Sequence, residues 1–148
     1  MILFAGILFT ILYTALIAVI GGELVWYFDL ASLTFVLVPL VFFLLITKYG
    51  KSLFGYIKSS LKKNYSYSED ELRNIASAAK SATKVTLTAG WFSFLIGLII
   101  VLRTIDVPQM TGAYLSVMII SLLYSAGIGY FVLFPLQAWA EYKLSKRG

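Results

Sequence analysis

The sequence has no cysteine and no histidine among its 148 residues. These two absences exclude disulfide frameworks, thiolate and imidazole metal sites, cysteine nucleophiles and histidine-based catalytic triads. Charge is also scarce, because Asp, Glu, Lys and Arg make up 13% of the chain, about half of their usual share in soluble domains. No catalytic constellation remains in the sequence, so an enzyme is the least favoured class of protein.

Apolar residues are abundant instead, at 60% of the chain. A soluble domain of this length cannot bury so much apolar surface, so the composition predicts one all-α integral membrane domain over residues 1–148. Four apolar stretches fit helical spans, near 2–20, 30–47, 85–103 and 113–139. The first could instead be a signal peptide, but no basic residue precedes it and no small-residue cleavage motif ends it.

The basic residues predict the orientation of these spans. Eight lie between spans two and three and three follow span four, so eleven of the twelve Lys and Arg residues share one side, with Arg103 as the exception. The positive-inside rule then places region 48–84 and both termini in the cytoplasm. We therefore read the net charge of +5 as an orientation signal and expect no nucleic-acid partner.

Region 48–84 is predicted to be a short helical hairpin that extends helices two and three. Apolar residues recur there at helical spacing on both sides of a polar turn at 64–68: Leu53, Phe54, Ile57 and Leu61, then Leu72, Ile75, Ala76, Ala79 and Ala82. Ser68 and Glu71 form a capping-box pattern. A plain connector is the alternative, although it would need neither the stripe nor the cap. The candidates for cytoplasmic contacts are Lys51, Lys58, Lys62, Glu69, Asp70 and Arg73.

Small and hydroxyl residues are the main polar feature of the spans, since no ionisable side chain lies at mid-membrane depth. They gather on one face of span three and one face of span four: Gly90, Ser93 and Gly97, and Ser121, Ser125 and Gly129. Small residues at this spacing let helix backbones approach closely in lipid. The same faces could also line a pore or receive a partner helix, and both alternatives stay open.

Two stretches resemble the MotA/TolQ/ExbB proton-channel family, and most closely a MotA-type stator subunit that lacks the large cytoplasmic domain. The matching elements are Gly21-Gly22, Asp29, Ser32 and Val36, then Gly97-Leu98, Asp106-Val-Pro108, Gly112, Leu123-Tyr-Ser-Ala126 and Phe134-Pro135. The resemblance implies a homopentamer of A-type subunits in the cytoplasmic membrane of a prokaryote. The ring would surround a dimer of single-span MotB/ExbD-like subunits, whose membrane Asp titrates.

The resemblance also implies roles for particular residues. The candidates for the ion path or the partner-facing surface are Ser93, Phe94, Gly97, Ser121, Leu122, Tyr124 and Ser125. Helix packing is expected at Gly90, Ser125, Gly129 and Pro135. Asp29 is expected to cap helix two.

Phe94 and Leu122 stand where the family often carries ion-path threonines, which makes the path drier and favours protons over Na⁺. No cofactor is implied, and membrane lipids are expected partners. The leading hypothesis is thus the A-type subunit of an ion-driven motor or energy transducer. The alternatives are a non-conducting homo-oligomeric scaffold or degenerate paralogue of the same fold, and an unrelated small four-span transporter or membrane-anchored adaptor.

Overall fold

The computed structural model describes residues 2–21, 28–60 and 66–146, and every regular element in these ranges is helical. The all-α prediction is therefore confirmed for the described chain. Lys62, Leu61, the first two residues of the polar turn at 64–68 and residues 22–27 between the first two predicted spans lie outside the described residues. The elements are α1 (Ile2–Gly21), α2 (Leu30–Ile46), α3 (Tyr49–Ser60), α4 (Glu69–Arg103), α5 (Pro108–Ala126), the π-helix η2 (Gly127–Leu133) and α6 (Phe134–Ser145).

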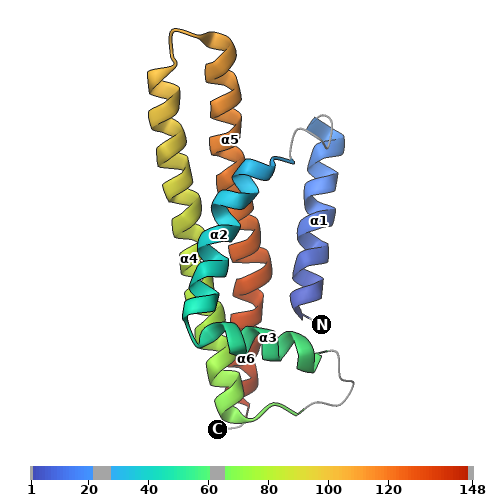
Figure 1. Ribbon diagram of the computed structural model, residues 1–148. Helices are drawn as coiled ribbons and strands as arrows, with labels where there is room; N and C mark the ends of the chain where they lie inside the picture. Colours follow the sequence, from blue (N-terminus) through green and yellow to red (C-terminus); the bar gives the residue numbers. More distant parts are fainter. Residues whose placement is uncertain (1, 22–27, 61–65, 147–148) are drawn as a thin grey trace.

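Two long helical columns lie side by side at the centre of the fold (Figure 1). One is α4, and the other is α5, η2 and α6 in continuous succession. Their stretches Glu69–Arg103 and Thr111–Ser145 are long and apolar enough to cross a membrane, and the pair formed by α2 and α3 is a third candidate. These lengths and compositions are those of a helical membrane protein.

The two remaining apolar helices lie against these columns. α2 packs on both α4 and α5, whereas α1 packs on η2 and α6. The apolar part of α1, Phe4–Ile17, is shorter than a full span, and α2 with 17 residues is about 25 Å long. The prediction of four spans therefore stays a prediction for α1 and α2.

The predicted straight extension of helix two is wrong. α2 ends at Ile46, and the chain bends by 99° before α3 begins at Tyr49. Thr47 adopts an extended conformation, and both its amide and its hydroxyl group donate to the carbonyl oxygen of Phe43, which ends the helix. Gly50 then lies against the carbonyl of Leu44, where a Cβ atom would collide, so the sharp corner depends on glycine.

The predicted extension of helix three is confirmed, since α4 continues without a break from Glu69 to Arg103. Its N-terminus carries the predicted capping box: Ser68 Oγ accepts from the Glu71 amide at 3.2 Å, and Glu71 Oε2 accepts from the Ser68 amide at 2.8 Å. Two otherwise unpaired backbone donors are thereby satisfied, which lets α4 begin well outside its apolar stretch.

A cluster of larger side chains joins α3, α4 and α6 at this end of the molecule, and we call it the base cluster. Its buried members include Leu40, Leu53, Tyr56, Leu72, Ile75, Leu133 and Leu136, together with alanines of α4 and α6. The predicted stripe on α4 is buried here, as expected. On α3 the prediction fails at Phe54, which is 63% exposed.

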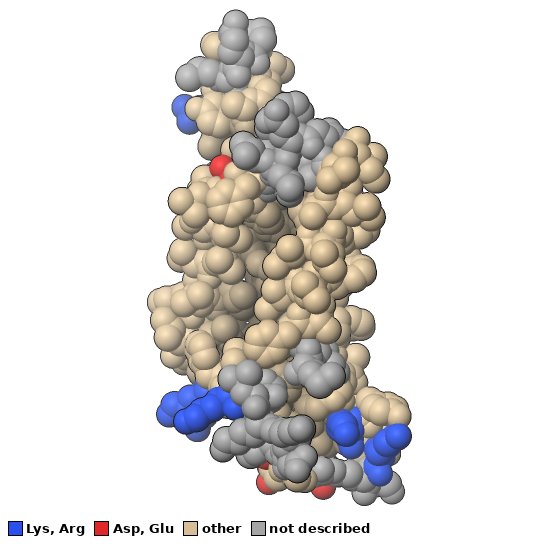
Figure 2. All heavy atoms as spheres, turned by 90° about the vertical axis from the view of Figure 1, so that its right-hand side faces the viewer, with Lys and Arg blue, Asp and Glu red and all other residues tan. Residues whose placement is uncertain are grey.

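Figure 2 shows that most of the lysine and arginine side chains in view gather around one end of the molecule, below a long column without them. The exposed lysines of this end belong to α3, α4, α6 and the corner between α2 and α3. Arg103 ends α4 at the opposite extreme. This distribution agrees with the charge pattern from which the orientation was predicted.

Candidate functional site

The helices α4 and α5 meet along a seam of small residues. We define the seam as Gly90, Ser93 and Gly97 of α4 together with Met118, Ser121 and Ser125 of α5. A Cβ atom at Gly90 would collide with the side chain of Ser125, and one at Gly97 would collide with Met118. The two backbones therefore approach more closely than larger side chains would allow. The structure thus brings together four of the seven predicted ion-path or partner-facing residues, Ser93, Gly97, Ser121 and Ser125, with Phe94 and Leu122 beside them at half-buried positions.

Two of the seam's buried hydroxyl groups bond to their own helix. Ser121 Oγ donates to the carbonyl of Met118 at 2.8 Å, and Ser125 Oγ donates to that of Leu122 at 2.9 Å. Thr86, which is also fully buried, donates to Ala82. Within the described residues no fully buried side-chain nitrogen or oxygen lacks a partner. In a single chain the seam therefore packs as a direct contact between α4 and α5.

Phe94 and Leu122 flank this seam. The Phe94 ring packs edge-on against the ring of Trp91, with centroids 5.8 Å apart. Trp91 itself faces outward and is 59% exposed. Phe94 and Leu122 thus add apolar surface beside the seam.

A second polar cluster joins the first turn of α2 to α5. Asp29 Oδ2 accepts from the Ser32 amide at 2.6 Å and caps α2. The Asp29 amide donates to the hydroxyl oxygen of Tyr124 at 3.0 Å, and Ser32 Oγ donates to the carbonyl of Val117 at 2.8 Å. Tyr124, expected on the ion path, therefore fixes the position of α2. The two contacts across helices could not be found from spacing, because they join residues 85 and 95 positions apart.

The π-helix η2 is a feature that the sequence analysis missed. Pro135 has no amide hydrogen for the carbonyl of Phe131 four residues earlier, and the Phe134 amide bonds to Gly129 in the wider pattern. A proline just after two closely spaced glycines is the signal that could have indicated it. Gly129 packs against Leu87, where a Cβ atom would lie 3.2 Å from Cδ2.

The π-helix also provides the surface on which α1 packs. Gly6 lies against the carbonyl of Phe131, and a Cβ atom at Gly6 would collide with it. The ring of Phe131 packs edge-on against Phe9 and Tyr13, at 5.3 and 5.9 Å between centroids. Wide π-turns often occur at functional positions, and here the turn holds the most peripheral helix.

The cytoplasmic contact candidates do not form one site. Arg73 and Glu69 pair across one turn of α4 at 2.6 Å, and this hydrogen bond and charge raise the pKa of the Arg73 guanidinium above its usual value. Asp70 and Lys58 are exposed on separate helices. Lys51 stands at the edge of a cavity of about 280 Å³ between α3 and α4, and Glu71 lines the same cavity.

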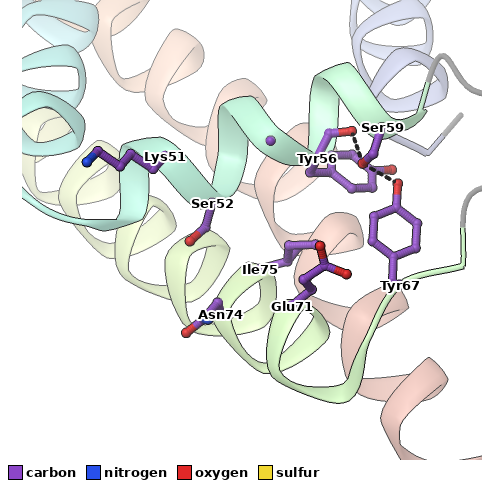
Figure 3. A pocket seen from close by; sticks show the side chains of 9 residues that line it. Lys51, Ser52, Tyr56, Ser59, Tyr67, Glu71, Asn74 and Ile75 are labelled. Atoms are coloured by element: carbon purple, nitrogen blue, oxygen red, sulfur yellow. Dashed lines mark hydrogen bonds between the residues drawn. The ribbon is translucent and has the colours of Figure 1, made fainter.

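The cavity is lined mainly by polar side chains (Figure 3). Ser59 Oγ donates toward the hydroxyl oxygen of Tyr67 at 2.9 Å. The Tyr67 ring packs edge-on against Trp139 of α6, and the Tyr56 ring packs at a tilt against both. Sequence spacing could not have assembled this aromatic group, because its members come from three segments. The described residues contain no group of three acidic, histidine or cysteine side chains that could hold a metal ion.

Comparison with known proteins finds no matching family model, no matching curated protein and no matching solved structure.

Proposed function

We propose that this chain is the A-type subunit of an ion-driven, and specifically proton-driven, energy transducer in the cytoplasmic membrane of a prokaryote. In this proposal it has four spans, with both termini in the cytoplasm. The observation that carries the proposal is the lack of any acidic, basic or histidine side chain at mid-membrane depth in the four apolar stretches. Membrane proteins that move protons need a titrating group at that depth. The chain would therefore supply the surroundings and a partner helix the carboxylate.

The proposed assembly is a pentamer around a dimer of single-span subunits that carry a membrane Asp. Its support is the family resemblance together with the large apolar surface that one chain leaves uncovered. Trp91, Phe92 and Leu95 face outward on α4, and Leu12 and Leu16 face outward on α1. Neighbouring subunits, the partner helix and lipid would cover these faces.

The preference for protons rests on the residues beside the seam. Phe94 and Leu122 offer no oxygen ligand, and a bare Na⁺ in an apolar passage has no replacement for its water. A proton bound to a partner carboxylic acid crosses the same surroundings as part of a neutral group. The path would accordingly run between the partner helix and the face formed by α4 and α5.

A non-conducting scaffold of the same fold is the second candidate, and the seam's hydrogen bonds favour it. Ser121 and Ser125 give their hydroxyl protons to carbonyls of α5, which leaves a packing surface with little to offer a passing ion. A scaffold of this kind would still assemble into the ring of subunits but would not conduct protons.

Two measurements test the proposal. Native mass spectrometry of the purified complex should show a ring that contains a single-span partner; a stable monomer would refute the assembly. Proton flux into vesicles should then require both proteins, and Phe94→Thr or Leu122→Thr should raise leak or broaden ion choice. Val38→Thr, at an outward position on α2, is the matched control. Strong flux from this chain alone would overturn the roles, and a ring with no flux would establish the scaffold.

A further inference from the structure

We propose that α3 lies at the membrane surface and that its outward lysines, Lys51 and Lys58, bind the anionic headgroups of membrane phospholipids. The proposal is independent of ring assembly and ion conduction. It rests on the direction of α3 relative to α2, on the residues that α3 leaves outside the protein, and on their charge.

The first argument is the corner between α2 and α3. α2 has 17 residues, about 25 Å of helix, which nearly spans a hydrocarbon layer of about 30 Å. The chain then turns by 99°, with Lys48 exposed in the turn. A helix that leaves a span at a right angle runs along the membrane surface. α3 therefore begins at the depth where hydrocarbon gives way to headgroups.

The alternative geometry, a broken span in which α3 re-enters the hydrocarbon, conflicts with its side chains. Lys51 and Lys58 are both exposed on α3, one near each end. Placing two uncovered ammonium groups in hydrocarbon is strongly unfavourable. At headgroup depth the same groups meet phosphate oxygens and water.

The second argument is how α3 divides its residues between protein and surroundings. Leu53 and Tyr56 turn into the base cluster. On the opposite side Lys51, Phe54 and Lys58 occupy successive turns, and all three are exposed. Phe54, 63% exposed, is an apolar ring that no described part of the protein covers. An aromatic ring flanked by lysines is typical of a helix at the headgroup boundary.

The third argument is charge. Neither α2 nor α3 contains an acidic residue, and among the described residues Lys51 and Lys58 have no salt-bridge partner. The acidic groups on the elements packed against α3 are Glu69, Asp70 and Glu71 of α4 and Glu141 of α6. Glu69 pairs with Arg73, and Glu141 accepts from Gln137. Figure 3 shows Lys51 extending away from Glu71, so its charge is directed outside the cavity.

Basic residues close to an anionic leaflet contribute about 1 kcal/mol each, which for two lysines corresponds to about 30-fold in binding. We therefore expect the full-length protein to retain phosphatidylglycerol over phosphatidylcholine in lipid-exchange native mass spectrometry. Lys51→Gln with Lys58→Gln should lower this preference about 30-fold, and Lys51→Arg with Lys58→Arg should keep it. Lys146→Gln is the control, since Lys146 lies over the Tyr142 ring on α6. An undiminished preference in the double glutamine variant would overturn the proposal.

The depth of α3 in the membrane is measured in a separate experiment with spin labels. Because the chain has no cysteine, each introduced cysteine carries the single label. A nitroxide at Phe54→Cys in lipid nanodiscs should show oxygen and nickel-complex accessibilities of the headgroup region. Labels at Val41→Cys of α2 and Asp70→Cys of α4, an exposed position in the first turn of that helix, give the hydrocarbon and aqueous references. A Phe54 label as exposed to the nickel complex as the Asp70 label, or as shielded as the Val41 label, would refute the surface position of α3.

Discussion

The base cluster and the seam bury opposite kinds of residue on the same helix. At the N-terminal end of α4, Leu72 is 1% exposed and turns inward, while Arg73 and Lys80 face out. Farther along α4 the pattern inverts: Gly90 and Ser93 turn inward, whereas Trp91 and Phe92 face out. The first pattern is that of a protein in water and the second that of a protein in lipid.

The difference shows where the hydrophobic effect operates. In water, burying Leu72 removes apolar surface from solvent, and this drives the base cluster together. In lipid the surroundings are as apolar as the side chains, so helices associate through close backbone packing and small residues occupy the contact. The inversion along α4 therefore supports a change from aqueous to lipid surroundings on the N-terminal side of Gly90.

The largest expected effect is in the base cluster. Leu72→Ala should lower the free energy of unfolding by about 2–5 kcal/mol, because it leaves a cavity in a contact driven by water. Denaturant unfolding of the protein in mild detergent measures the change. Trp91→Ala removes more atoms from an outward position and should change stability far less. Equal losses in the two variants would contradict the assignment of two different surroundings.

The second prediction concerns the seam between α4 and α5, where the substitution adds a methyl group to a glycine. Gly90→Ala puts a Cβ atom into the side chain of Ser125 and should destabilise the protein by about 1–3 kcal/mol. Gly55→Ala is the matched control, because a Cβ atom there meets nothing within 4 Å, and alanine in an open helix should instead stabilise by about 0.5–1 kcal/mol. Changes of the same sign would show that the seam is loose.

A smaller effect is expected where α2 joins α5. Tyr124→Phe removes the hydroxyl that accepts from the Asp29 amide and should cost about 0.5–1.5 kcal/mol. Tyr130→Phe, at an exposed position on η2, should cost nothing measurable. A nitroxide pair on α2 and α5 should also show a broader distance distribution in Tyr124→Phe, and an unchanged distribution would argue against this anchor.

The smallest effect on stability is expected for the exposed ion pair near the N-terminus of α4. Arg73→Gln breaks the exposed pair with Glu69 and should leave the unfolding midpoint unchanged. Glu69 raises the pKa of Arg73, so any stabilisation is present at and below neutral pH and is lost only in strong alkali. Stability compared between wild type and variant from pH 6 to 9 should give parallel curves. A divergence within that range would show that the pair matters more than its exposure suggests.

Several features could be predicted from the sequence because their causes are local. The all-α architecture follows from the long apolar stretches, the capping box from Ser68 and Glu71, and the cap of α2 from Asp29. The stripe beginning at Leu72 and Ile75 follows from helical periodicity. Each depends on residues within one or two turns of one another, and the structure places each of them as the pattern indicates.

The features that failed or were missed depend on contacts between distant segments. Phe54 fits the apolar period of α3 yet lies outside, because the 99° corner after Ile46 sets which face of α3 meets α4. That corner requires Gly50 to pack against the Leu44 carbonyl. The aromatic group in the cavity and the bond between Asp29 and Tyr124 likewise join separate elements.

The sequence by itself determined that the chain is helical and apolar, where its capped helices begin, and which small residues let two helices approach. Only the tertiary structure decided that Gly90 meets Ser125 across the seam, that Tyr124 anchors α2 and that the outer side of α3 carries Lys51 and Lys58. The physical reason is that propensity, capping and periodicity act over a few residues along the chain. Hydrogen bonds between helices, and the face that each helix leaves exposed, depend instead on which helices pack against one another.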